Sequence, residues 1–391
     1  MVRSTGLFSQ VISEICSRVD FDTFVEKHAA ERASKGFSSK TQLASMLFCH
    51  FAFADSLRAI TNGMQSCKGS LAPLGIKPPK RSTLAYANAH RPAALFQDYF
   101  FALLEQYRAF SPMLRRKKKF RFKSKLYSFD STTITLSLSL FPWASYRQAK
   151  GGVKIHVLLD HDDYMPAFVQ ITNANVHDSQ MSKCLSLKPG SIIVMDRGYV
   201  DYSQFYAWEK SQVRFVTRLK DNAVYETVQS RALPRYRDNL VLDEEVRLTS
   251  PKAREYYPQT LRRVVVHNEE NDEDLVLLTN DFQLSAATIA DIYKDRWEIE
   301  LFFKTLKQNL KVKTFVGTSE NALRIQLWTA LISLLVLKWL HYLSQAGWSF
   351  VNMVMMFRLN LLTFRDLMAW LREPVKTPPL VPDYGQRKLP L

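Results

Sequence analysis

The sequence predicts an α/β protein whose core carries a β-rich insertion and is flanked by helical regions. Three observations predict this fold class. From residue 125 onward apolar residues follow strand patterns, and helical patterns separate the later strands. Further strand patterns fill about 222–272. The segments 1–112 and 313–372 instead carry apolar residues at helical spacing. At 391 residues the chain is long enough for two or three domains.

The N-terminal segment, residues 1–112, is predicted to be helical, with a Gly- and Pro-rich loop at 67–82 and a break or kink at Pro92. Short helices joined by a basic loop suit a helix-turn-helix domain that binds DNA. An all-α packing domain explains the same pattern equally well. In the first case the expected phosphate contacts are Lys77, Lys80 and Arg81.

A dense cationic run follows, and residues 113–124 are predicted to form a basic linker. The net charge of the whole chain is +16, which points to an acidic partner, most often nucleic acid. Phe120 and Phe122 are interleaved with the charges of the run. Such runs are usually solvated linkers. Placed directly before the α/β core, this one could also bind a DNA backbone.

The predicted core, residues 125–312, begins with three strands joined by hairpins and continues as helix, strand, helix, strand. Its first strand carries Asp130, and Asp196 follows the apolar run that forms its fourth strand. This is the ribonuclease-H-like order, in which the first and fourth strands are neighbours. Asp130 and Asp196 are therefore expected to lie close together, although 66 residues (196 − 130) separate them. Either aspartate alone could simply cap a helix.

One amphipathic helix is predicted over residues 285–313, with a charged face beside its apolar stripe. At 3.6 residues per turn, each residue advances by about 100°. The side chains that fall within about 40° of Glu300 are Tyr293, Arg296, Lys304, Lys307 and Lys311. A solvated face with ion pairs such as Glu300–Lys304 would be the simpler explanation. Asp130 and Asp196 weaken it, because with Glu300 they could complete a metal site.

Three converging carboxylates suit metal-assisted phosphoryl transfer. Mg²⁺ (or Mn²⁺) prefers oxygen ligands and leaves much of its coordination sphere to water and phosphate. Three carboxylates can hold two ions, one activating the attacking oxygen and one stabilising the leaving oxygen. Without a cation, such carboxylates would repel one another and raise their pKa values. The sequence therefore predicts a two-ion site at Asp130, Asp196 and Glu300.

On these residues the chain resembles the DDE transposases of bacterial insertion sequences, in the group whose signature is Tyr-x2-Arg-x3-Glu-x6-Lys. The resemblance covers most of residues 120–330. Asp130, Asp196 and Glu300 match the three acidic positions, and the signature is completed without a change of spacing by Tyr293, Arg296 and Lys307. The resemblance implies that the three acids hold the metal ions and perform catalysis. It also implies that DNA is contacted by Tyr293, Arg296, Lys304, Lys307 and Lys311.

The resemblance further implies that the β-rich insertion at about 222–272 holds the DNA end. Its basic candidates are Arg247, Lys252, Arg254, Arg262 and Arg263. In this family an aromatic residue of the insertion is associated with a displaced base. The choice among Tyr225, Tyr236, Tyr256 and Tyr257 stays open.

The implied function is excision and integration of an insertion sequence by hydrolytic nicking, hairpin formation and strand transfer. The expected partners are the element's terminal inverted repeats, target DNA and a second copy of the chain in a homodimeric synaptic complex. Two alternatives use the same fold or the same carboxylates. They are a ribonuclease-H-like nuclease or resolvase, and a catalytically inactive DNA-binding relative.

Other classes are disfavoured. The four cysteines include no C-x2-C pair, which argues against a zinc knuckle, and a disulfide framework is not indicated for so large a chain. The uncharged stretch 325–337 is shorter than the roughly twenty residues that span a membrane, so a buried helix and no membrane partner are expected. The N-terminus lacks a signal-peptide pattern. The resemblance implies a bacterial cytoplasmic, nucleoid-associated protein. The Pro-rich tail, 373–391, is expected to be disordered.

Overall fold

The computed structural model describes residues 6–32, 34, 36–109, 119–147, 150–233, 239–269, 271–310 and 314–379. Part of the basic linker (113–118), Tyr236, Lys311 and the end of the Pro-rich tail (380–391) lie outside the described residues. The chain divides into two compact units. One contains Arg115–Lys304, and the other contains Met1–Leu114 together with Thr305–Leu391.

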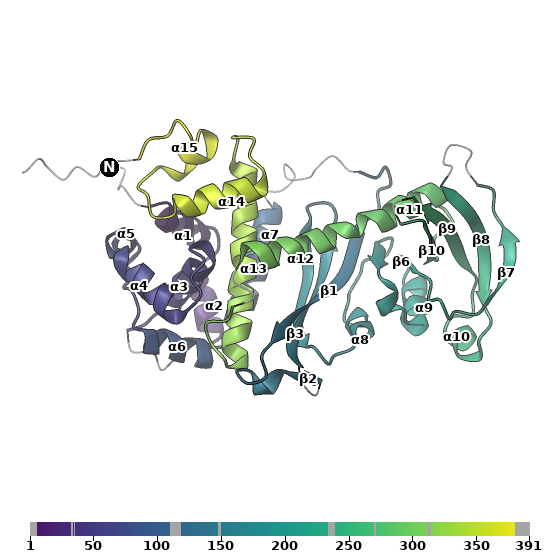
Figure 1. The fold of residues 1–391 in the computed structure, drawn as a ribbon, viewed down its shortest axis with the longest axis horizontal. Helices are drawn as coiled ribbons and strands as arrows, with labels where there is room; N and C mark the ends of the chain where they lie inside the picture. Colours follow the sequence, from purple (N-terminus) through teal and green to yellow (C-terminus); the bar gives the residue numbers. More distant parts are fainter. Residues whose placement is uncertain are drawn as a thin grey trace, which may run out of the picture. The chain divides into compact units, whose positions relative to one another are not determined.

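The unit built from both ends of the chain is helical, as the sequence predicts. Its helices of ten or more residues are α1 (Leu7–Arg18), α3 (Ser39–Phe51), α4 (Leu57–Ser66), α6 (Arg81–His90), α7 (Ala93–Ala109), α13 (Glu320–Leu343) and α14 (Phe350–Leu359), and the shorter ones are α2 (Phe21–Lys27), α5 (Lys68–Leu71) and α15 (Leu367–Arg372) (Figure 1). The expected break at Pro92 separates α6 from α7. It follows from the missing N–H of proline and from the extended conformation that proline imposes on Arg91.

Helix α13 is the buried helix that the uncharged stretch 325–337 predicts. It packs against α3, α6 and α7 of the same unit. By length and composition alone it could cross a membrane, but 89% of its most apolar window is buried inside the protein. It is the single described helix that passes this test, and burial of this extent is typical of a core helix.

The other unit contains one ten-stranded sheet, which confirms the mixed α/β fold class. The strands are β1 (Leu126–Leu136), β2 (Ser145–Arg147), β3 (Lys150–Asp160), β4 (Met165–Asn173), β5 (Ile192–Met195), β6 (Arg214–Arg218), β7 (Tyr225–Ser230), β8 (Leu240–Leu248), β9 (Leu261–Asn268) and β10 (Glu273–Thr279). Their order is β2-β3-β1-β5-β6-β10-β9-β8-β7, with β4 paired to β3. The strands predicted within the insertion therefore continue the core sheet beyond β6, as Figure 1 shows.

Helices cover both faces of this sheet. Because strand side chains alternate, Ile192 and Val194 of β5 face α11 (Ala286–Asp295), whereas Ile193 and Met195 face α9 (Tyr202–Lys210). The first face is filled by the apolar side of α11, and the second by aromatic residues such as Phe205 and Trp208. A strand buried on both faces has to be apolar at every position, which explains the run Ile192–Met195.

The prediction of one uninterrupted helix over 285–313 is wrong. Helix α11 ends at Asp295, and α12 (Trp297–Asn309) begins after Arg296. The Arg296 N–H donates to the Tyr293 carbonyl at 3.1 Å, and the Ile299 N–H donates to the Arg296 carbonyl at 3.1 Å. Both bonds span three residues instead of four, so the backbone tightens locally at Arg296. Arg296 thus lies at the junction between the two helices.

Candidate active site

Two neighbouring parallel strands bring Asp130 and Asp196 together. Strand β1 pairs with β5 in a register that sets Phe129 opposite Met195, so each aspartate follows a paired residue. Alternation places Asp130 on the same face of β1 as Leu126, and Asp196 continues the face of Val194. That face is the one covered by α11. Both carboxylates therefore project toward the helices that carry the signature residues.

Three signature side chains meet these aspartates. The Arg296 guanidinium donates through Nη1 to Asp130 Oδ2 at 3.3 Å and through Nη2 to Glu300 Oε1 at 2.7 Å. The Tyr293 hydroxyl donates to Asp196 Oδ1 at 3.4 Å. Asp130 and Glu300 are consequently separated by no more than one guanidinium group and its two hydrogen bonds. Five residues from three separate segments form one contiguous cluster within a single unit.

Burial and charge shift the acidity of this cluster. Burial, reinforced by the charges of Asp196 and Glu300, raises the pKa of Asp130 to about 6, although the Ser131 N–H and Arg296 oppose the shift. Burial likewise raises the pKa of Tyr293 to about 12. Burial would lower the pKa of Arg296, but Tyr293, Glu300 and Asp130 outweigh it and hold that pKa above its usual value. The arginine is therefore a permanent cation among the acids.

The donor chemistry of the cluster suits a hard divalent cation. Oxygen ligands from carboxylates are what Mg²⁺ and Mn²⁺ prefer, and the raised pKa of Asp130 marks a carboxylate that a nearby cation would stabilise. No three His, Cys, Asp or Glu side chains of the described residues are already arranged as a metal site. Arg296 explains this, because its guanidinium lies between Asp130 and Glu300. A cation shared by all three acids would require Arg296 to release one of them.

The predicted lysines follow Glu300 on α12. Lys304 lies about one turn beyond it and is exposed, and Lys307 lies about two turns beyond and is partly buried. Lys311 lies outside the described residues, so its predicted place on this face stays a prediction.

Two of the basic candidates in the insertion have structural partners instead. Arg262 is only 2% exposed and donates to both carboxylate oxygens of Asp243, at 2.8 and 2.7 Å, which contradicts its expected contact with DNA. Arg263 donates to Glu244 at 2.6 Å. Among the tyrosines, Tyr257 is buried and donates to Glu209 at 3.2 Å, so it cannot hold a base. By contrast, the exposed candidates are Lys252, Arg254 and Tyr256.

Sequence reasoning missed His161 and Asp295. His161 lies in the turn between β3 and β4, and its Nδ1 donates to Asp295 Oδ2 at 2.6 Å. Asp295 is buried directly before Arg296. The one available signal was an acid directly before the signature arginine. An amphipathic pattern does not show whether such an acid is buried or solvated.

Known proteins resemble this chain along most of its length. A family model described as "Transposase DDE domain" matches residues 121–336, and a domain of unknown function (DUF4372) matches residues 3–77. The chain is 34% identical over 303 residues to "Putative transposase y4zB" of Sinorhizobium fredii, covering 77% of this chain and 82% of that protein.

Two further similarities extend this comparison. The chain is 35% identical over 229 residues to "Probable transposase for insertion sequence element IS5377" of Geobacillus stearothermophilus, covering 58% of this chain and 59% of that protein. The solved synaptic complex of piggyBac transposase with hairpin DNA overlaps with a TM-score of 0.43 at 12% identity, covering 94% of this chain and 80% of that one. An overlap of that size supports no argument about fold or mechanism.

Proposed function

The chain belongs to the DDE transposases, and from this premise we propose that Asp130, Asp196 and Glu300 are its catalytic residues. It is a DNA transposase related to those of insertion sequences, so DNA is its substrate. The observation that carries the assignment is the cluster itself. Three acids from β1, the end of β5 and α12 meet around Arg296 and Tyr293. Arg296 donates to Asp130 and Glu300, Tyr293 donates to Asp196, and the charges of Asp196 and Glu300 act on Asp130.

Divalent metal dependence is a general property of the DDE family. We propose two Mg²⁺ or Mn²⁺ ions, held by Asp130, Asp196 and Glu300. When bound, such ions activate the attacking oxygen and neutralise the charge that develops on the leaving oxygen. Asp130 suits this task because its burial disfavours the isolated anion. A cation beside Asp130 therefore stabilises the ionised carboxylate more than it would stabilise a solvated one.

We propose that Arg296, Tyr293 and Lys307 bind phosphates of the element's DNA end, assisted by Lys304 and Lys311. A guanidinium can bind a phosphate through two parallel donors, whereas a lysine acts as a point charge. The terminal nitrogens of Arg296 are paired with Asp130 and Glu300, so a phosphate bound in this way would take the place of one of these acids. In this proposal the reaction proceeds by hydrolytic nicking, hairpin formation and strand transfer.

The sheet order supports a finer fold assignment. We propose that β4-β3-β1-β5-β6, in which β3 alone runs antiparallel to the other four strands, forms a ribonuclease-H-like core. A reaction on two DNA ends needs both in one assembly, so we also propose a homodimer in the synaptic complex. The N-terminal helices are proposed to contact DNA through Lys77, Lys80 and Arg81.

The test of the catalytic assignment is Glu300→Gln. We expect nicking of DNA that carries a terminal inverted repeat to fall by at least about 10³-fold, because an essential charge at the reacting centre is lost. Binding of the same DNA should stay within about threefold, since one charge changes among many phosphate contacts. The matched control is Glu298→Gln, which makes the same change two residues earlier on α12. A Glu300→Gln variant that still cuts would refute the assignment.

A strand-joining assay separates transposase chemistry from that of a simple nuclease. The 3′-hydroxyl of a pre-cut element end should become joined to target DNA in a reaction that depends on Glu300. A protein that uses only water as nucleophile would produce nicks and no joined product.

A further inference from the structure

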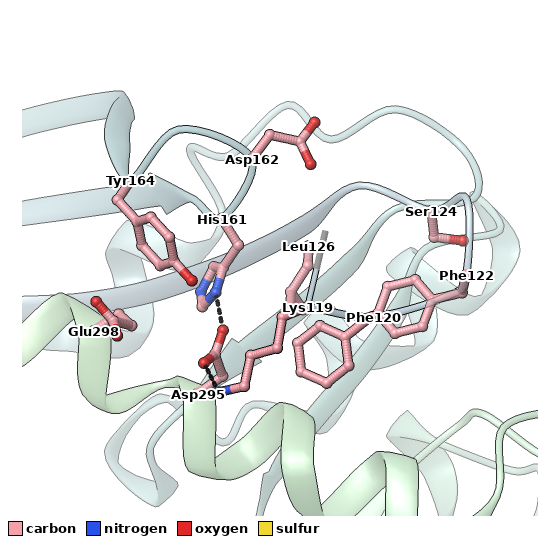
Figure 2. Close-up of a pocket in the computed structure, with 10 residues that line it drawn as sticks. All are labelled: Lys119, Phe120, Phe122, Ser124, Leu126, His161, Asp162, Tyr164, Asp295 and Glu298. Carbon is pink, nitrogen blue, oxygen red and sulfur yellow. Dashed lines mark hydrogen bonds and ion pairs between the residues drawn. The ribbon is translucent and has the colours of Figure 1, made fainter. Parts of the chain in front are cut away.

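A buried polar network lies beside the candidate active site and lines a pocket of about 280 Å³ (Figure 2). His161 is its centre. The imidazole Nδ1 donates to Asp295 Oδ2 at 2.6 Å, because a carboxylate can only accept, and Nε2 shares a hydrogen bond of 2.7 Å with Ser128 Oγ. Lys119 donates to the other oxygen of Asp295. Figure 2 shows Lys119 and His161 converging on Asp295 from different segments.

Each end of this network is next to a proposed catalytic group. Ser128 precedes Asp130 by two residues on β1, so both lie on the same face of the strand. Asp295 directly precedes Arg296, the residue at the junction of α11 and α12. His161 therefore links the strand that carries Asp130 to the helix junction from which Arg296 and Glu300 are displayed.

The network also has the connectivity of a Ser-His-Asp nucleophile, but it cannot act as one. Ser128 is 0% exposed inside β1, so no substrate can reach its hydroxyl. A triad requires its serine to meet the scissile group. The contacts of His161 are therefore available for positioning and not for nucleophilic attack.

We propose that His161 is a positioning residue that fixes the α11–α12 junction against β1. Its bond to Asp295 sets the place of Arg296 and Glu300 relative to Asp130. The proposal rests on the function proposed above. Its energetic basis is a buried acid: Asp295 is 3% exposed in its side chain, and burial alone would raise its pKa. Hydrogen bonds from His161 and Lys119 instead lower that pKa, so the ionised carboxylate stays anchored.

The backbone of His161 is held independently of its imidazole. Its N–H donates to the Leu126 carbonyl at 3.0 Å, and Lys125 bridges Asp160 and Asp162 at 2.8 and 2.6 Å. The turn should therefore keep its place when the side chain is replaced. This separates the effect of the imidazole on the junction from a general loss of the turn.

The two ring nitrogens can be tested separately. His161→Asn keeps a donor near the position of Nδ1 and loses the Ser128 contact, whereas His161→Gln reaches toward Ser128 and loses the Asp295 contact. We expect His161→Gln to lower the single-turnover nicking rate on saturating inverted-repeat DNA about 10²-fold, because a displacement of roughly 1 Å at a reacting group has this effect. His161→Asn should stay within about threefold of the wild type.

Two further measurements complete the experiment. DNA affinity should stay within about twofold in both variants, and Tm should fall no further in His161→Gln than in His161→Asn. The inference is overturned if the two variants nick equally fast, or if the loss of nicking simply follows the loss of Tm. Failure of the proposed function looks different, because the wild type and Glu300→Gln would then nick alike.

Discussion

Two arginines in the sheet-containing unit pair with carboxylates in contrasting ways. Arg262, in β9, is 2% exposed and binds both oxygens of one partner, Asp243, in a two-point pair. Arg296 has a side chain that is 14% exposed, and it divides its two terminal nitrogens between Asp130 and Glu300. The first arginine also donates to the Asp281 carbonyl at 3.1 Å, while the second leaves Nε without a partner among the described residues.

The contrast separates an arginine that pairs within the fold from one for which we propose a role in the chemistry. The donors of Arg262 bind the buried Asp243 carboxylate and a backbone carbonyl, so its role is to hold the strands together. Arg296 divides its terminal nitrogens between two acids, and one of them, Asp130, has a raised pKa that a nearby divalent cation would lower. Basic character alone therefore does not indicate contact with DNA.

The largest expected effect comes from removing the saturated arginine. Arg262→Ala should destabilise the unit by about 3–5 kcal/mol, because Asp243 would remain buried without its partner. Urea denaturation followed by circular dichroism measures this change. Arg247→Ala is the control, since its 3.4 Å pair with Glu226 is exposed and should contribute under about 1 kcal/mol. If Arg262→Ala lowers the free energy of unfolding as little as Arg247→Ala does, Arg262 does not have the structural role assigned to it.

The next effect concerns pH. The pKa of Asp130 is raised to about 6 in the folded protein, so the protonated carboxyl stabilises the fold at low pH and this contribution disappears as pH rises through 6. A rise of roughly two units corresponds to about 2–3 kcal/mol. In EDTA, Asp130→Asn should therefore be more stable than the wild type at pH 8 and nearly equal to it at pH 4.

Chemical denaturation at the two pH values measures this difference. Asp221→Asn serves as the control, because its side chain is 87% exposed. If the stabilities of Asp130→Asn and Asp221→Asn depend on pH in the same way, the pKa of Asp130 is not raised in the folded protein. The two arginine sites would then be more alike than proposed.

The smallest effect separates the steps of the reaction. Arg296→Ala should cost less stability than Arg262→Ala, yet impair hairpin formation about tenfold more than nicking, because the DNA end loses a phosphate contact. Gel analysis of nicked and hairpin products over time gives both rates. If both steps slow equally, Arg296 acts only by pairing with Asp130 and Glu300 and does not contact DNA.

Much of the sheet could be predicted because its signals are local. The strand predicted to carry Asp130 and the apolar run predicted as the fourth strand correspond to β1 and β5. The convergence of Asp130 and Asp196 also followed, since strand order alone makes their strands neighbours. The cluster around Glu300 has the composition expected from the signature, and its catalytic role stays a proposal.

Other features depend on contacts that local patterns do not encode. The partner of Arg262 is 19 residues away and buried, so charge alone made this arginine look like a DNA contact. The interruption at Arg296 involves one residue within an otherwise regular helical periodicity, where backbone hydrogen bonds span three residues instead of four. The anchoring of Asp295 by His161 spans 134 residues, a distance over which no periodicity carries information.

The late position of Glu300 has a consequence during synthesis. Ribosomes build proteins from the N-terminus, and domains generally fold as their segments emerge. Strands β1 and β5 can pair once the first half of the chain is free, but the third acid is residue 300 of 391. Under the catalytic assignment proposed above, a nascent or prematurely terminated chain therefore cannot break chromosomal DNA until most of its length has been translated.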